Sequence, residues 1–291
     1  MSSRPRPRLR SGAPSRRTAA YAVLIAGGLI MVAPLLWALS ASLQSLEEVY
    51  AFPRRSWPAD PQWSNFAEAV SKLPFDRFMF NSLLISTVSA CGALLTSAMA
   101  GYAFARLPWP GRRIWFVILL LSLLIPSQVL LIPRFLIFKS LGWVDTYKPL
   151  IVPAWLGGGA FNVLLFTEFF RRLGSAAEDA ALIDGASPWQ IFWRVHLPAA
   201  RPVAIVVVMM SFVLHWQEFL DPLIYLSDFE TYPVSLGLRM YQSLAGTWLN
   251  LLMAASLVAL VPVALVVLLC LRLARWRVDG GLVGGRPWLA N

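Results

Sequence analysis

The sequence predicts an all-α membrane protein with six transmembrane helices. Hydrophobic residues make up 58% of the 291 positions and charged residues only 14%, proportions far from those of a soluble domain of this length. Charged residues are absent from five long stretches: 18–46, 78–105, 114–133, 149–167 and 240–271. A sixth apolar stretch, 202–227, is interrupted only by Glu218 and Asp221. About 20 apolar residues cross a bilayer core, and helices satisfy their own backbone groups in lipid.

The spans are expected at about 19–42, 78–105, 113–133, 149–170, 201–226 and 245–272. The first span is too long for the apolar core of a signal peptide, so we expect it to remain uncleaved behind a basic, disordered leader, residues 1–18. The second carries small residues, among them Ala98 and Gly101, which let neighbouring membrane helices approach closely. Pro126 and Pro133 should kink or end the third. The resulting single membrane domain covers residues 19–277, and a C-terminal tail covers 278–291.

Basic residues predict the orientation of these spans. With a cytoplasmic N-terminus, 17 of the 25 Lys and Arg residues fall in inside segments, so the positive-inside rule places both termini in the cytoplasm. Because the excess charge flanks the membrane and forms no stripe on one face, it argues against nucleic-acid binding.

A polar segment of about 172–198 lies between the fourth and fifth spans, and local signals divide it into two short helices. Gly185 is the residue type that ends a helix with positive φ. Ser187, Pro188 and Gln190 then form the pattern of a capping box with a proline start. A helix–Gly–helix elbow on the cytoplasmic side of a membrane protein suggests a docking site for a soluble partner.

The elbow resembles the EAA loop of the membrane subunits of binding-protein-dependent ABC importers. That pattern reads Glu-Ala-Ala, three residues, Gly, nine residues, then Ile-x-Leu-Pro. Asp179 replaces its Glu and Val195 its Ile, while Glu178 lies one position earlier. The other matching positions are Ala180, Ala181, Gly185, Leu197 and Pro198. Further blocks, such as Trp216 through Leu220, are similar to the carbohydrate branch of this family and to its maltose-type second permease.

This resemblance implies a coupling helix in the elbow that docks on a cytoplasmic ATPase. The residues expected to couple are Glu178, Asp179, Ala180, Ala181, Asp184 and Gly185. The partners implied are a distinct second permease, an ATPase dimer and an extracytoplasmic sugar-binding protein that meets the external loop around Glu47 to Trp63. The chain is thus expected in the cell membrane as a multi-pass subunit of an ATP-driven importer for a sugar or sugar derivative.

The chain is not expected to hydrolyse ATP itself. A P-loop needs a lysine after a glycine, and none of the three lysines, Lys72, Lys139 and Lys148, follows one. We therefore expect ATP and Mg²⁺ on the partner and no cofactor in this chain. Its two histidines, His196 and His215, have no neighbouring ligands at the spacing of a metal site.

The substrate path is predicted from the polar end of the fifth span. Glu218 and Asp221 lie three positions apart in that helix and are expected to share a face, and carboxylates at membrane depth are functional candidates. Trp216 could stack on a sugar ring and Gln217 could bind its hydroxyls. The alternative is that Glu218 bonds within the bundle and Asp221 marks the helix end.

Three other functions are alternatives. The first is an importer permease for another small solute, such as glycerol phosphate, an amino acid or a peptide. The second is an intramembrane enzyme with Glu218 and Asp221 as acid and base, which leaves the elbow unexplained. The third is a secondary carrier, which usually shows interrupted helices in repeated halves, and no such repeat is evident here.

Overall fold

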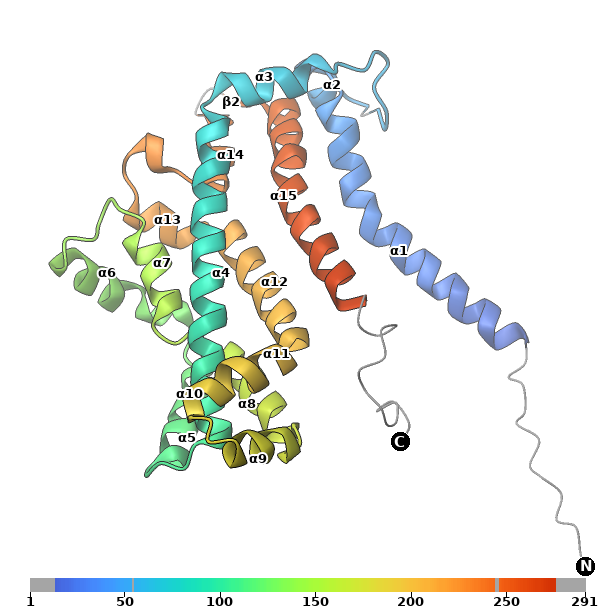
Figure 1. Cartoon of the computed structure of the whole chain (residues 1–291). Coiled ribbons are helices and arrows are strands. Elements are labelled where there is room, and N and C mark those ends of the chain that lie inside the picture. Colours follow the sequence, from blue (N-terminus) through green and yellow to red (C-terminus); the bar gives the residue numbers. More distant parts are fainter. Residues whose placement is uncertain (1–13, 54, 244–245, 276–291) are drawn as a thin grey trace, which may run out of the picture.

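The chain folds into an arrangement of helices around one long central helix (Figure 1). The computed structural model describes residues 14–53, 55–243 and 246–275. Four helical segments in this part are long and apolar enough to cross a membrane, and up to six are present if each of two bent pairs is one span. The all-α prediction is confirmed, apart from a hairpin of two two-residue strands, β1 (Gln242–Ser243) and β2 (Gly246–Thr247). The N-terminal leader and the C-terminal tail fall mainly or wholly outside the described residues.

The helices follow in this order: α1 (Pro14–Ser42), α2 (Leu46–Tyr50), α3 (Ser64–Lys72), α4 (Phe75–Arg106), α5 (Arg112–Ser122), η1 (Ser127–Leu130), α6 (Leu131–Ser140), α7 (Lys148–Trp155), α8 (Ala160–Arg172), α9 (Ala176–Ile183), α10 (Pro188–Ile191), the π-helical η2 (Phe192–His196), α11 (Leu197–Ala199), α12 (Arg201–Gln217), α13 (Leu220–Tyr225), η3 (Phe229–Thr231), α14 (Val234–Arg239) and α15 (Leu249–Arg275).

Helix α4 is the central element, and α7, α8 and α12 pack along it. The predicted role of small residues is visible at Gly101, where an added Cβ would lie 2.5 Å from Phe166 Cβ and 3.0 Å from the backbone nitrogen of Thr167. Any larger side chain would force α8 away from α4. This close contact lies beside a buried aromatic cluster that includes Tyr102, Phe170 and Phe192.

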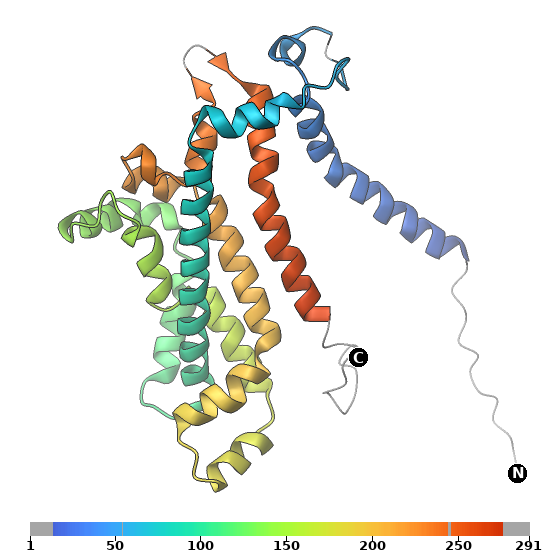
Figure 2. The ribbon, with the colours of Figure 1, turned by 45° about the horizontal axis from the view of Figure 1, so that its top comes forward.

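The elbow and the segments predicted to be external occupy opposite ends of the molecule (Figures 1 and 2). Helices α9 and α10 lie at one end of α4, and α2, α3 and the hairpin lie at the other. Helix α1 meets α15 near α3 and then diverges from the rest of the molecule. The apolar part of α1 has no buried residue in its most hydrophobic window.

The third predicted span is broken. Helix α5 ends at Ser122, and the following segment, Ser127–Ser140, is turned from it by 97°. Pro126 adopts extended backbone at the break, as expected of a residue that has no amide hydrogen and disfavours helix before it. The predicted kink is confirmed at Pro126, and the size of the bend goes beyond what the sequence indicates. The same prediction is wrong for Pro133, which lies in the first turn of α6, a helix that continues to Ser140.

The fourth predicted span is interrupted between α7 and α8. Three consecutive glycines, 157–159, have φ values of 120°, 67° and 88°. These are left-handed backbone conformations that favour glycine. The helix therefore stops and restarts inside one candidate crossing, Lys148–Arg172.

The prediction of a continuous fifth helix over 201–226 is wrong. Helix α12 ends at Gln217, Glu218 is extended with ψ of 125°, and α13 starts at Leu220. Pro222 has no amide hydrogen to donate to the carbonyl of Glu218 four residues earlier. That carbonyl accepts a hydrogen bond from Ser235 Oγ at 2.6 Å instead. Glu218 and Asp221 consequently do not share a helix face.

Candidate coupling elbow and substrate-path residues

The elbow has the local geometry that its sequence predicts. Gly185 has φ of 77°, its amide donates to Leu182 O at 3.0 Å, and the Ala186 amide donates to Ala181 O at 2.9 Å. This pair of bonds is a Schellman motif, which ends α9 and satisfies its last carbonyls. The chain therefore reverses sharply between α9 and α10.

The predicted capping box is also present. Gln190 N donates to Ser187 Oγ at 3.3 Å, and Ser187 N donates to Gln190 Oε1 at 2.8 Å. Pro188 occupies the first position of α10, where no amide donor is needed. Both limbs of the elbow are thus capped by bonds within the segment itself.

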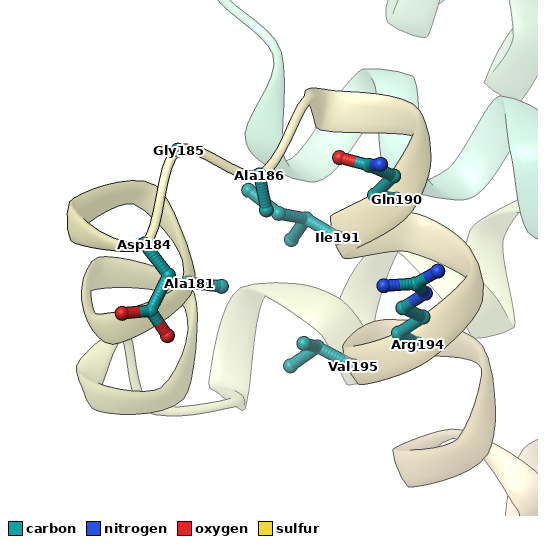
Figure 3. A pocket seen from close by; sticks show the side chains of 8 residues that line it. All are labelled: Ala181, Asp184, Gly185, Ala186, Gln190, Ile191, Arg194 and Val195. Atoms are coloured by element: carbon teal, nitrogen blue, oxygen red, sulfur yellow. The ribbon is translucent and has the colours of Figure 1, made fainter.

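A hollow of about 370 Å³ lies between the two limbs (Figure 3). Asp184 stands at the end of one limb, and Arg194 extends from the other. Small and aliphatic side chains line the space between these charges. The full lining is Ala181, Asp184, Gly185, Ala186, Gln190, Ile191, Arg194 and Val195.

The outer surface of the elbow is more apolar than its polar sequence suggests. Ile183 is 87% exposed, and Leu182 and Trp189 are more than half exposed. The predicted coupling residues Asp179, Ala180, Asp184 and Gly185 are exposed as well, and Ala181 is half-buried. An exposed apolar cluster rimmed by charges is typical of a protein–protein contact surface. The sequence carries a signal for it, since α9 has apolar residues on more than one face.

Glu178 differs from the other predicted coupling residues because its side chain points into the protein. Its Oε2 lies 3.3 Å from Arg106 Nη1 and 3.2 Å from His196 Nε2. His196 is fully buried, with its ring against those of Tyr102 and Phe170. Burial lowers the pKa of His196, and the Glu178 carboxylate acts in the opposite direction. No sequence pattern connects these three residues.

The candidate substrate-path residues occupy different environments. Trp216 is only 6% exposed and stacks on Phe212, so it belongs to the helix core and offers little surface to a sugar ring. Gln217 is exposed. The Glu218 carboxylate accepts hydrogen bonds from the amides of Leu220 at 3.1 Å and Asp221 at 3.3 Å.

Asp221 forms an ion pair with Arg134 of α6, a residue that no sequence motif singles out. Both side chains are partly exposed, at 25% for Asp221 and 33% for Arg134. The pair joins the bent segment after α5 to the short helix after α12. It is a charged contact between the third and fifth predicted spans.

Comparison with known proteins identifies the family. Residues 92–278, which include the whole elbow, match the family described as binding-protein-dependent transport system inner membrane component. The chain belongs to this family. It is therefore a permease subunit of an ABC importer.

Three curated relatives align with most of the sequence of this permease. It is 32% identical over 255 residues to the diacetylchitobiose uptake system permease protein NgcG of Streptomyces coelicolor, covering 86% of this chain and 84% of that protein. It is 31% identical over 276 residues to the sulfoquinovosyl glycerol transport system permease protein SmoH of Agrobacterium fabrum, covering 94% of each. It is 29% identical over 268 residues to the sn-glycerol-3-phosphate transport system permease protein UgpE of Yersinia enterocolitica, covering 89% of this chain and 94% of that protein.

The permease fold is also found in a solved transporter. A chain from the crystal structure of a bacterial ABC transporter involved in the import of the acidic polysaccharide alginate superposes with a TM-score of 0.78 and 20% identity. The match covers 92% of this chain and 99% of that one. At this identity the likeness is one of fold.

Among the described residues of the permease, no group of three His, Cys, Asp or Glu side chains is arranged to hold a metal ion.

Proposed function

We propose that this permease forms half of the translocation path of an ATP-driven importer for a sugar or sugar derivative. The observation that carries the proposal is the elbow, which lies within the family match and combines a sharp reversal with an exposed apolar and charged surface. The names of the relatives support a polyhydroxylated substrate, since they specify diacetylchitobiose, sulfoquinovosyl glycerol and sn-glycerol-3-phosphate. A permease for glycerol phosphate or another small solute is the alternative.

The elbow is the proposed contact with a separate ATPase. Asp179 and Asp184 are exposed and able to pair with basic groups, while Ile183 and Trp189 supply apolar area around them. The hollow between the limbs has room for a projecting side chain of the partner. ATP and Mg²⁺ would be held by that partner, since the sequence lacks a P-loop.

We further propose six spans with both termini in the cytoplasm. In this arrangement α5 and Ser127–Ser140 together form the third span, and α12, which meets Pro188–Ala199 of the elbow at 78°, belongs to the fifth. The first residues of α1 and the last of α15 point toward the elbow's end of the molecule. A second, distinct permease would cover part of α1, whose apolar surface is exposed in this chain alone. The external end, with α2, α3 and the loop between them, is the proposed contact for the binding protein.

The substrate path is proposed to run past the ends of the interrupted spans. Arg134 and Asp221 are partly exposed and opposite in charge, so both are able to bond sugar hydroxyls. Gln217 and Glu218 lie close to Asp221 in sequence. Trp216 is the least suited of the predicted residues because it is buried.

Reconstitution tests this proposal. The permease would be purified together with the second permease and the ATPase of the same importer. The complex would then be incorporated into liposomes and supplied with the binding protein. We expect ATP-dependent accumulation of a radiolabelled sugar ligand, with diacetylchitobiose and sulfoquinovosyl glycerol as the panel. The comparison substrates are sn-glycerol-3-phosphate, an amino acid and a peptide. Accumulation of only the comparison substrates would overturn the carbohydrate assignment, and accumulation without ATP would overturn the importer mechanism.

A further inference from the structure

A mostly buried charged cluster connects the elbow to the helix bundle. It consists of Arg106 at the end of α4, Glu178 of α9 and His196 of η2. The exposed fractions of their side chains are 15%, 17% and 0%. One carboxylate oxygen, Glu178 Oε2, lies 3.3 Å from Arg106 Nη1 and 3.2 Å from His196 Nε2.

Two further bonds attach neighbouring segments to the same end of α4. The Arg106 guanidinium donates to the carbonyl of Leu173, which follows α8. The Tyr102 hydroxyl donates to the carbonyl of Pro188 at 3.3 Å, at the start of α10. The last turns of α4 therefore contact the end of α8 and both limbs of the elbow.

Helix α9 depends on this cluster for its position. None of its residues is buried, so α9 has no apolar face packed into the core. Among the described residues, the ion pairs that connect α9 to the rest of the chain are those of Glu178. The next residue, Asp179, carries the same charge but is exposed and forms no ion pair within the part of the chain that the structure describes.

We infer that Glu178 is a positioning residue that clamps the elbow to α4 through Arg106 and His196, and that it is not itself a contact for the ATPase. A largely buried ion pair is costly to break, because removal of one partner leaves an uncompensated charge. Force applied to the elbow is therefore transmitted to α4 and to the end of α8 as one rigid unit. This inference rests on the proposed function, which supplies the force.

The test compares Glu178→Gln with Glu168→Gln in the complete complex. Each substitution replaces one glutamate by glutamine, but Glu168 forms an exposed ion pair with Arg171 within α8, outside the elbow. For Glu178→Gln we expect wild-type retention of the ATPase on copurification and continued ATP hydrolysis. The amount of radiolabelled substrate imported per ATP hydrolysed should fall by about tenfold or more. For Glu168→Gln we expect wild-type ATPase retention and unchanged import per ATP.

Variants of His196 provide an independent measurement if Glu178→Gln assembles poorly. His196→Gln keeps a nitrogen donor for the carboxylate and should preserve import per ATP, whereas His196→Leu removes the donor and should lower it. A purely structural role would reduce the yield of assembled complex in both variants and leave import per ATP intact.

Two results would overturn the inference while leaving the proposed function in place. One is loss of the ATPase from Glu178→Gln with normal import per ATP in the remaining complexes, which would make Glu178 a docking contact. The other is wild-type coupling in both Glu178→Gln and His196→Leu. Failure of the wild-type permease to retain any ATPase would instead refute the proposed function, and this inference with it.

Discussion

Substitution of Gly185 separates the conformation of the elbow from its contact with a partner. Its φ of 77° is a left-handed conformation, which costs about 1–2 kcal/mol for most L-residues and less for Asn. A Cβ at this position would have no atom within 4 Å. No neighbouring atom therefore blocks a Cβ at this position, and the cost of alanine there is that of the backbone.

Three variants of Gly185 should therefore differ in a defined order. Gly185→Asn should couple almost normally, and Gly185→Ala should weaken the elbow by about 1 kcal/mol, roughly a fivefold shift in its local equilibrium. Gly185→Trp has the same backbone cost as Gly185→Ala, but its indole projects into the space that the ATPase would occupy. We expect Gly185→Trp to insert into the membrane and to lose both ATPase retention and uptake.

The assay is copurification of the ATPase together with ATP-driven uptake in liposomes. Gly142 supplies a matched control, because it has φ of 67° and no atom within 4 Å of an added Cβ, yet lies between α6 and α7, away from the elbow. Gly142→Trp should retain the ATPase. Normal ATPase retention and uptake in Gly185→Trp would refute the reasoning, and equal losses in the Ala and Trp variants would assign the effect to the backbone.

Three more outcomes follow from the geometry. Ser187→Ala should destabilise α10 by about 1 kcal/mol, seen as faster amide hydrogen exchange over 189–191. Ser175→Ala should not change exchange, because Ser175 makes no side-chain cap bond. Gly101→Leu should lower the Tm of the purified permease, consistent with overpacking by about 1–3 kcal/mol, while Gly27→Leu, with open space around it, should not. Because burial lowers the pKa of His196, its neutral form contributes stability that is present above its ordinary pKa of ~6.5 and is lost as the pH falls below it. The protection factors of elbow amides, which correct for the slower intrinsic exchange at lower pH, should therefore fall on acidification in the wild type and less in His196→Gln.

The parts of the structure that can be predicted from sequence are those set by local chemistry. The bonds that form the turn at Gly185 and the cap of α10 join residues three to five positions apart, so the elbow and both caps can be predicted without tertiary information. Pro126 similarly signals the break in the third span. The glycines 157–159 are an equally local signal for the interruption between α7 and α8, and the expectation of one continuous span over 149–170 takes no account of them.

The features beyond prediction depend on residues far apart in the sequence. Helix α12 can end at Gln217 within an apolar span because the carbonyl of Glu218, which has no helical partner, accepts a hydrogen bond from Ser235. The periodicity of the sequence cannot reveal that partner. Arg106 and Glu178 are 72 positions apart and meet only because α4 and α8 pack closely at Gly101. The apolar stretch 202–227 resembles one helix because hydropathy does not register the missing amide hydrogen of Pro222.

The most direct test of the central claim is site-specific photo-crosslinking from the elbow. A photoreactive amino acid at position 184, which is exposed at the turn of the elbow, would be activated in complexes in native membranes. We predict a crosslink to the ATPase subunit, with a yield that changes between the nucleotide-free and ATP-bound complexes. A complex that transports substrate while position 184 crosslinks to no ATPase in either state would contradict the account.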